Sequence, residues 1–322
     1  MKALLHSLAT GALLWAVWPF HARAGDAASP TVDPAAAERA SGSPRRLALP
    51  PGARSLRDLE YVRGGHERQR LDLYLPPNGT NVPLVIWVHG GAFRAGSKDR
   101  CPALWLVREG YAVASINYRL SQHARFPAQI EDCKAAVRWL RARASDYGLD
   151  PNRFGAWGAS AGGHLVALLG TAGAVKEFDQ GEHLAVSSRV QAVCDWFGPT
   201  DFTQMSKFPS RMDHDAADSP ESQLLGGPVQ QFKDRAARAN PITYVSRETP
   251  PFLIMHGDQD PLVPLNQSEL LHAALQRAGV PVTFHVVKGA GHGFAGPELT
   301  AMVRDFFQKH LRPAQSLLGQ DR

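Results

Sequence analysis

Short apolar runs alternate with longer amphipathic stretches along most of the chain, and this alternation restricts the fold more than any other feature. The apolar runs are predicted strands at residues 71–75, 83–88, 111–118, 154–157, 190–197, 251–255 and 282–287. Helices are predicted between them at residues 102–110, 127–146, 161–172, 266–279 and 297–311. Strands that are apolar at almost every position are typical of a parallel sheet with helices on both faces. We therefore expect an α/β fold with a mostly parallel central sheet and an active site at the carboxyl ends of the strands.

The stretch 127–146 shows the helical pattern clearly. Its apolar residues recur every three or four positions, at Ile130, Cys133, Val137 and Leu140. Charged residues fill the other positions, and we expect them to face solvent: Glu131, Lys134, Arg138 and Arg141. The pattern predicts an amphipathic helix that covers one face of the sheet.

Segments of different composition flank the alternating region. Residues 1–24 have a basic start, an apolar middle and small residues at Ala22 and Ala24, which is typical of a secretory signal peptide cleaved after Ala24. The alternative for this segment is an uncleaved membrane anchor. Residues 25–54 are rich in Ala, Pro, Gly and Ser and predict a flexible leader. We expect a secreted or periplasmic protein without stable membrane association after cleavage, with one folded domain at 55–313 and a tail at 314–322.

One long segment inside the domain breaks the alternation. Residues 203–250 are polar with weak periodicity and are too many for an ordinary connection. We interpret them as a small helical cap inserted after the strand that ends near Phe197. Within this cap Asp213, His214 and Asp215 offer possible cation ligands, but a solvated charged loop is the favoured interpretation.

Charge and cysteine content exclude several classes of protein. The chain has 35 Lys and Arg against 30 Asp and Glu, and removing residues 1–24 leaves a net charge of +3. The basic residues are scattered without interleaved aromatic residues, so nucleic-acid binding is not expected. The three cysteines, Cys101, Cys133 and Cys194, allow one disulfide at most and leave a Cys101–Cys133 pair open. Their spacing is not that of a zinc site, and we expect no metal and no cofactor.

A serine lies at the sharpest turn that the sequence predicts. The strand that ends at Trp157 runs into Gly158-Ala159-Ser160-Ala161-Gly162, and a helical stretch follows directly. This is the G-x-S-x-G pattern in a strand–turn–helix context, which presents the serine at a helix N-terminus whose amides favour negative charge. We interpret Ser160 as a nucleophile.

A serine nucleophile needs a general base and an acid that orients the base, and both should follow Ser160 in the chain. The loop after the strand at 282–287 places His292 between glycines, and we interpret it as the base. The loop after the preceding strand offers two acids, Asp258 and Asp260. We interpret two other histidines as structural residues: His164 and His256.

Backbone amides near the serine can complete such a site. The strand at 83–88 ends in His89-Gly90-Gly91-Ala92-Phe93, a turn whose amides can point toward Ser160. The amide of Ala161 lies directly after the serine and offers a second contribution. Such donors stabilise the oxyanion that forms during acyl transfer.

Together, HGGAF, GASAGGH, HGDQDPLVP and GHGF, in this order, resemble the motifs of an α/β-hydrolase. More narrowly, SINYRLS, LDPNRFGAWGASAGGHL and the LLGG before NPITYVS resemble secreted bacterial esterases of the feruloyl and acetylxylan esterase-like group. The resemblance covers about residues 56–312. It implies the α/β-hydrolase fold for this domain, with the cap as an insertion.

The resemblance also implies a role for each matching residue. Ser160 corresponds to the nucleophile and His292 to the general base. The D-x-x-V-P pattern within HGDQDPLVP favours Asp260 over Asp258 as the acid. The oxyanion hole is assigned to three backbone amides: those of Gly91, Ala92 and Ala161. Ala92 replaces a glycine that is more common in related lipases, which keeps the amide donor but leaves the loop less free to adjust.

The implied activity is that of a serine carboxylesterase acting on short-acyl or hydroxycinnamoyl esters, including small-molecule and oligosaccharide esters. The polar cap lacks the clustered large apolar residues of a lipase lid, which favours short acyl groups. Trp196 and Phe197 either form an aromatic wall for the substrate or belong to the core. The alternatives are a lipase or an amide or formamide hydrolase with the same catalytic residues, and, from a different class, an inactive binding protein on a hydrolase fold.

Overall fold

The structure, a computed structural model, describes residues 49–312. The predicted signal peptide, most of the predicted leader and the predicted tail lie outside these residues. Within them, no helix is long and apolar enough to span a lipid bilayer. Leu49 and Ala53, at the end of the predicted leader, pack against the hydrophobic core.

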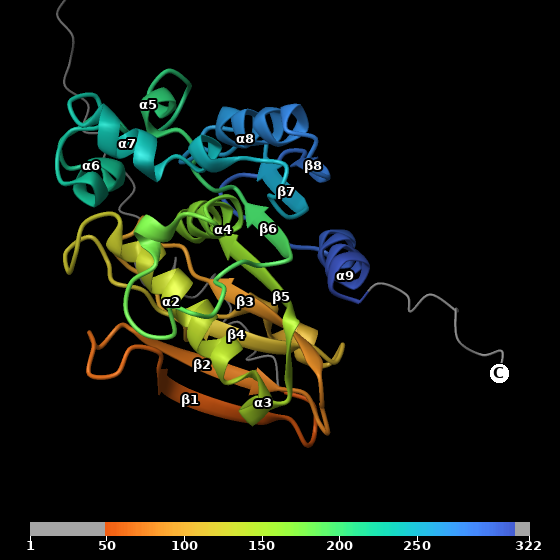
Figure 1. Cartoon of the computed structure of the whole chain (residues 1–322). Helices are drawn as coiled ribbons and strands as arrows, with labels where there is room; N and C mark the ends of the chain where they lie inside the picture. The colour runs from red at the N-terminus through yellow and green to blue at the C-terminus, as the bar shows by residue number, and fades with distance from the viewer. Residues whose placement is uncertain (1–48, 313–322) are drawn as a thin grey trace, which may run out of the picture. The chain divides into compact units, whose positions relative to one another are not determined.

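An eight-stranded sheet forms the centre of the described chain, in the order β1-β2-β4-β3-β5-β6-β7-β8 (Figure 1). The strands are β1 (Arg54–Glu60), β2 (Arg70–Leu75), β3 (Val82–Val88), β4 (Ala112–Ile116), β5 (Leu149–Ala159), β6 (Ala192–Trp196), β7 (Phe252–Gly257) and β8 (Val282–Val287). β1 with β2 and β2 with β4 pair antiparallel, and the other five pairings are parallel. The mostly parallel sheet confirms the expected architecture. β1 is not among the predicted strands, because its sequence RSLRDLE is polar and its side chains stay largely exposed at the sheet edge.

Helices cover both faces of this sheet. They are η1 (Pro102–Val107), α2 (Ala128–Ala142), α3 (Ala144–Tyr147), α4 (Ala161–Thr171), η2 (Lys176–Phe178), α5 (Phe202–Met205), α6 (Pro220–Leu225), α7 (Lys233–Ala239), η3 (Pro241–Tyr244), α8 (Asn266–Arg277) and α9 (Pro297–Leu311). Side chains alternate along each strand, so that Ile86 faces one apolar layer and Trp87 the other. The first layer packs against α2, α4 and α8, and the second against η1 and α9. Figure 1 shows α9 apart from α2 and α4.

The segment between α4 and β6 buries charges on α2 that the sequence predicts to be exposed. Lys134 Nζ lies 3.0 Å from Asp179 Oδ1, and Arg138 Nη1 lies 2.9 Å from the same atom. Both cationic side chains are at most 1% exposed. The prediction that Lys134 and Arg138 face solvent was wrong, because their anionic partner lies 41 residues beyond Arg138 and helical periodicity does not reveal it.

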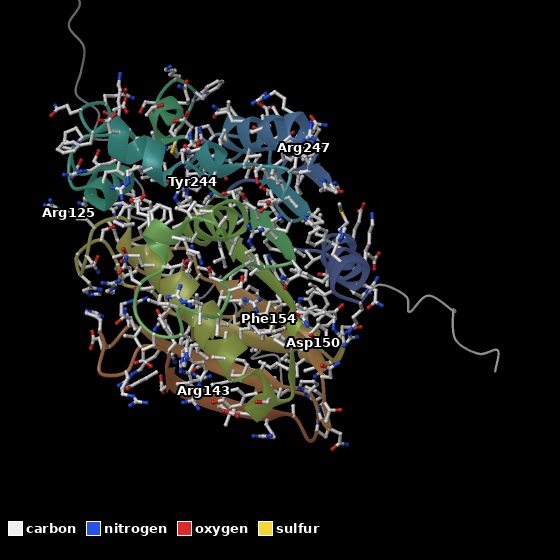
Figure 2. All side chains as sticks on the ribbon, in the orientation of Figure 1. Arg125, Arg143, Asp150, Phe154, Tyr244 and Arg247 are labelled. Carbon is white, nitrogen blue, oxygen red and sulfur yellow. The ribbon has the colours of Figure 1, made fainter. Side chains whose placement is uncertain are left out.

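The insertion at residues 203–250 contributes α6, α7, η3 and most of α5. Its residues Met205, Leu224 and Leu225 are buried in the apolar layer that contains α2 and α4. Tyr244 of η3, labelled in Figure 2, packs its ring 5.7 Å from that of Phe178 in η2. The insertion therefore has extensive apolar contacts with the rest of the domain, although its sequence shows weak periodicity.

Candidate active site

Ser160 lies in a tight turn between β5 and α4. Its backbone has φ 56° and ψ −124°, a conformation that is strained for a residue with a side chain. A Cβ on Gly158 would lie 2.2 Å from the Gly162 carbonyl oxygen, and one on Gly162 would lie 2.0 Å from that of Val88. Because only glycine fits these positions, the G-x-S-x-G pattern encodes a serine held above the sheet edge at the first turn of a helix.

Three side chains that follow β5, β7 and β8 form a continuous hydrogen-bonded chain. His292 Nε2 lies 3.0 Å from Ser160 Oγ, and His292 Nδ1 lies 2.8 Å from Asp260 Oδ2. The other oxygen of Asp260, Oδ1, accepts hydrogen bonds from the amides of Leu262 at 2.8 Å and Val263 at 3.0 Å. These amides fix the carboxylate, which in turn orients the imidazole toward the serine.

Of the two candidate acids, Asp260 is the one that the structure brings to His292. Asp258 lies nearer the end of β7, and its Oδ1 accepts a hydrogen bond from the Gly289 amide at 2.6 Å. Its Oδ2 lies 3.3 Å from Lys288 Nζ. Asp258 therefore fastens the start of the loop that carries His292.

A second imidazole, that of His256, contacts the Asp260 carboxylate. His256 Nε2 lies 3.3 Å from Asp260 Oδ2 and 2.9 Å from the Val263 carbonyl oxygen. A carbonyl can only accept, so Nε2 carries a proton, and Nδ1 faces the Ser268 hydroxyl at 2.7 Å. Burial works against the charged form of Asp260, but hydrogen bonds from His256 and His292 outweigh it and hold the pKa of this carboxyl well below its usual range. The structural role predicted for His256 did not include this contact, which its position at the end of β7, four residues before the acid, could have indicated.

The loop after β3 carries the backbone amides expected to form the oxyanion hole. Gly91, Ala92 and Phe93 have φ values of 116°, 55° and 59°, so the chain turns sharply over three residues. A Cβ on Gly91 would lie 2.3 Å from the Ala95 carbonyl oxygen, which excludes other residues there. Ala92 adopts a positive φ despite its side chain, so its departure from glycine does not prevent the turn. Ala161 is the first residue of α4, where a backbone amide has no acceptor within the helix.

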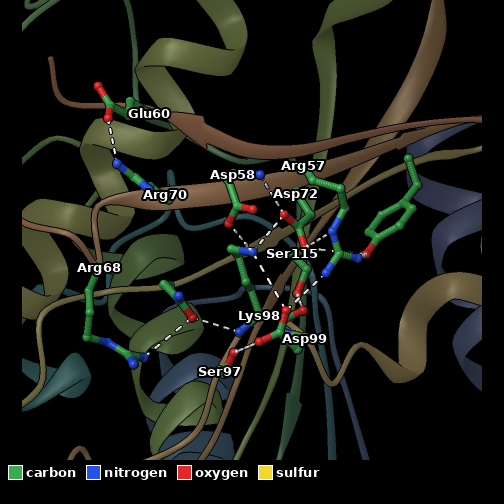
Figure 3. A network of polar contacts seen from close by, with 12 residues as sticks. Arg57, Asp58, Glu60, Arg68, Arg70, Asp72, Ser97, Lys98, Asp99 and Ser115 are labelled. Atoms are coloured by element: carbon green, nitrogen blue, oxygen red, sulfur yellow. Dashed lines mark hydrogen bonds and ion pairs between the residues drawn. The ribbon is translucent and has the colours of Figure 1, made fainter.

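Two cationic side chains fasten this loop to the domain. Arg68 Nη2 donates to the Gly96 carbonyl at 2.9 Å and lies 3.0 Å from His89 Nε2. Lys98 Nζ lies 2.8 Å from Oδ1 of the fully buried Asp72, within the polar network of Figure 3. Burial lowers the pKa of His89 to about 4, so its ring is neutral at pH 7. These contacts could not be predicted from the sequence, because they join segments far apart in the chain and carry no motif.

Ser160 and His292 line a cavity of about 380 Å³. All three residues assigned to the oxyanion hole line it: Gly91, Ala92 and Ala161. Phe197 also lines the cavity, and its ring centroid lies 4.7 Å from that of His292. Trp196 instead packs against Trp157, with ring centroids 5.0 Å apart, in the second apolar layer. One of the two aromatic residues, Phe197, therefore faces the cavity, and Trp196 belongs to the core.

The insertion contributes a buried ion pair to the cavity wall. His214 Nδ1 lies 3.1 Å from Glu221 Oε2, both residues line the cavity, and their side chains are 1% and 5% exposed. The expectation of a solvated charged loop at residues 213–215 was wrong for His214. Its ring is buried, and besides the contact with Glu221 its Nε2 lies 3.0 Å from the Leu262 carbonyl oxygen.

The described residues form neither a metal cluster nor a disulfide. Among residues 49–312 no group of three or more His, Cys, Asp and Glu side chains could hold a metal ion. All three cysteines are buried as free thiols, including the pair left open by the sequence: Cys101 and Cys133. Burial raises the pKa of Cys101 to about 12, which keeps this thiol protonated at neutral pH.

Comparisons with known proteins agree with this geometry. Residues 71–275 match the model of the BD-FAE family. Esterase LipQ of Mycobacterium tuberculosis is 34% identical over 258 residues, which cover 77% of this chain and 58% of LipQ. The chain thus spans less than two thirds of the length of this curated relative.

Two solved structures of esterases are also similar to this chain, which covers a larger share of their length than of LipQ. A truncated carbohydrate esterase from gut microbiota has a TM-score of 0.74 and 35% identity, covering 80% of this chain and 96% of that one. An acetyl ester-xyloside bifunctional hydrolase from Caldicellulosiruptor lactoaceticus has a TM-score of 0.61 and 27% identity, covering 74% of this chain and 84% of that one. These names confirm the resemblance to the feruloyl and acetylxylan esterase-like group and agree with the expected enzyme class, a carboxylic ester hydrolase. The chain therefore has the α/β-hydrolase fold and belongs to the BD-FAE family.

Proposed function

We propose that this protein is a serine carboxylesterase that uses neither a metal nor a cofactor. The observation that carries this proposal is the hydrogen-bonded chain from Ser160 through His292 to Asp260. Ser160 and His292 line a cavity that is also lined by the loop after β3. A nucleophile, a base and an orienting acid in this arrangement perform acyl transfer. Membership of the BD-FAE family and the esterase names of the relatives support the same activity.

The first half of the reaction forms an acyl-enzyme. Ser160 Oγ attacks the ester carbonyl carbon while its proton passes to His292 Nε2. The carbonyl oxygen becomes an oxyanion that accepts hydrogen bonds from three amides: those of Gly91, Ala92 and Ala161. Asp260, ionised because its pKa is depressed, stabilises the imidazolium. The imidazolium then protonates the leaving alcohol as the ester C–O bond breaks, and the acyl group stays on Oγ.

The second half repeats these steps with water. His292 removes a proton from a water molecule, whose oxygen attacks the acyl carbon and forms a second oxyanion. The bond to Ser160 Oγ then breaks, and the imidazolium returns its proton to the serine. The carboxylic acid leaves, and the enzyme regains its starting state.

We further propose that the preferred substrates are short-acyl or hydroxycinnamoyl esters, including those of sugars. A cavity of about 380 Å³ lies at the small end of the range for ligand sites, which suits a short acyl group. The Phe197 ring beside His292 offers a flat apolar surface on which a sugar or phenyl ring can pack. The carbohydrate-esterase name of a solved structure that this chain covers to 96% supports the same class.

Export to the periplasm or the exterior is part of the proposal and depends on residues 1–24. Their basic start, apolar middle and Ala22/Ala24 pair are typical of a cleaved signal peptide. Export also suits a polymeric ester that cannot enter a cell. Mass spectrometry of the protein recovered from outside the cytoplasm should give Gly25 as the first residue, and a chain that retains Met1 would contradict cleavage.

Hydrolysis assays with a series of substrates test the proposed activity. We expect kcat/KM for p-nitrophenyl esters to be highest at acetyl to butyryl and to fall toward dodecanoyl, with release of acetate from acetylated xylan or of ferulate from methyl ferulate. Ser160→Ala should lower these rates by about 10³-fold or more. A steady rise toward dodecanoyl would instead indicate a lipase, cleavage of amides or formamides alone an amidase, and the absence of any hydrolysis an inactive binding protein.

A further inference from the structure

Glu221, a carboxylate on the wall of the active-site cavity, takes no part in the mechanism above. It lies in the first turn of α6, its side chain is 5% exposed, and it lines the same cavity as Ser160 and His292. An ionised carboxylate in a protein interior is costly unless it is paired and hydrogen-bonded. The fold must therefore supply Glu221 with partners.

His214 is the partner that the fold supplies. Its Nδ1 lies 3.1 Å from Glu221 Oε2, and its Nε2 lies 3.0 Å from the Leu262 carbonyl oxygen. The Leu262 carbonyl and an ionised carboxylate can both only accept hydrogen bonds, so both ring nitrogens carry protons and donate. Burial favours the neutral ring, but the contact with Glu221 outweighs it and raises the pKa of His214. The pair is thus an imidazolium and a carboxylate, and one oxygen of Glu221 is fixed.

The other oxygen, Glu221 Oε1, has no hydrogen-bond partner within residues 49–312. The cavity that Glu221 lines is largely apolar, with contributions from Phe197, Met212, Pro220 and Leu262. A carboxylate oxygen is a strong acceptor, and hydrogen bonds to it are stronger than those between neutral groups. An acceptor of this kind in the wall of the active-site cavity can receive a hydrogen bond from a donor on the substrate.

We propose that Glu221 accepts a hydrogen bond from a hydroxyl group of the substrate and thereby determines specificity. This inference depends on the proposed esterase function and narrows it to esters that carry a free hydroxyl group on the alcohol or on the acyl group. A partially acetylated sugar has such a group on its alcohol side, and a hydroxycinnamate has one on its acyl side. An ester without the donor leaves Glu221 Oε1 without a hydrogen bond when the ester fills the cavity, and sites of this kind discriminate strongly against such analogues.

Kinetics of Glu221→Gln with three kinds of ester test the proposal. The substrates are an O-acetylated xyloside with free hydroxyls, methyl 4-hydroxycinnamate beside methyl cinnamate, and p-nitrophenyl acetate, which has no hydroxyl. We expect kcat/KM to fall tenfold or more for at least one hydroxylated ester, mainly through KM, and to stay within threefold for p-nitrophenyl acetate. The parent enzyme should itself prefer its hydroxylated substrate over the matched ester without the hydroxyl, a measurement that needs no variant.

A matched control is available on the same insertion. Asp234 lies on α7 and is exposed, so Asp234→Asn removes the same charge away from the cavity and should leave every rate unchanged. A loss for the xyloside places the recognised hydroxyl on the alcohol, and a loss for the hydroxycinnamate places it on the acyl group; both outcomes support the proposal. An equal loss for all substrates would show a purely structural Glu221 and overturn the inference while the esterase function stands. A parent enzyme that hydrolyses none of them would overturn the proposed function itself.

Discussion

The substitution Asp260→Asn tests how the orienting carboxylate acts. An amide has the shape of the carboxyl group and keeps one oxygen for the backbone amides of Leu262 and Val263. Its NH₂ group would then face His292 Nδ1, which can no longer donate in that direction and must accept instead. The ring proton moves to Nε2, toward Ser160, and this tautomer cannot take the proton of the serine.

The expected loss of activity is large and is a loss in kcat. Enzymes that lose the orienting acid in this way lose about 10⁴ in kcat, which corresponds to about 5.5 kcal/mol of transition-state stabilisation. KM should change little, because Asp260 is not among the residues that line the cavity. Asp258→Asn removes the same charge two residues away and serves as the control. Its cationic partner Lys288 is 83% exposed, so this ion pair stabilises the loop only weakly, and kcat should stay within about threefold.

The assay is initial-rate hydrolysis of p-nitrophenyl acetate near pH 8, with both variants matched to the parent by circular dichroism. The reasoning is refuted if Asp258→Asn loses about 10⁴ in kcat while Asp260→Asn remains active. Equal activity of the two variants would refute it as well, because the two carboxylates make different contacts.

Three further substitutions test the surroundings of the site. Burial raises the pKa of Asp195 to about 6, above its unfolded value of about 3.9, so the native state binds more protons between these values and stability falls as pH rises through this window. The free energy of unfolding of Asp195→Asn, measured relative to that of the parent, should therefore rise by about 2–3 kcal/mol from pH 4 to pH 8. Urea midpoints that show no such relative rise would contradict this. Gly162→Ala places a Cβ 2.0 Å from the Val88 carbonyl oxygen and should remove most activity and lower the Tm; a fully active variant with an unchanged Tm would show that the turn adapts. Lys98→Met leaves buried Asp72 without its closest cation and should cost about 3 kcal/mol in urea unfolding, whereas a change below about 0.5 kcal/mol would mean that the remaining partners suffice.

The residues near the reacting atoms could be picked out from the sequence because backbone geometry restricts them. The turn at Ser160 admits only glycine at positions 158 and 162, and the loop after β8 places glycines on both sides of His292. These constraints leave a local pattern at the end of a strand. The central strands were predictable for a similar reason, since burial on both faces makes them apolar throughout.

The features that the sequence did not reveal depend on contacts between distant segments. Lys134 and Arg138 are buried because Asp179, far along the chain, covers them. β1 pairs through its backbone at the sheet edge and needs no apolar side chains, so its polar sequence does not indicate a strand. The pair of His214 and Glu221 becomes part of the cavity only when the insertion packs beside the Leu262 loop.

The central claim is that Ser160 is the nucleophile of an acyl-transfer reaction, and covalent trapping tests it most directly. The protein is incubated with diethyl p-nitrophenyl phosphate, which phosphorylates activated serines, and is then digested and analysed by mass spectrometry. We expect one diethylphosphoryl group per chain on the peptide that contains Ser160, one equivalent of released p-nitrophenolate, a parallel loss of esterase activity and no labelling of Ser160→Ala. Labelling of a different residue, or an active enzyme that remains unlabelled, would contradict the account.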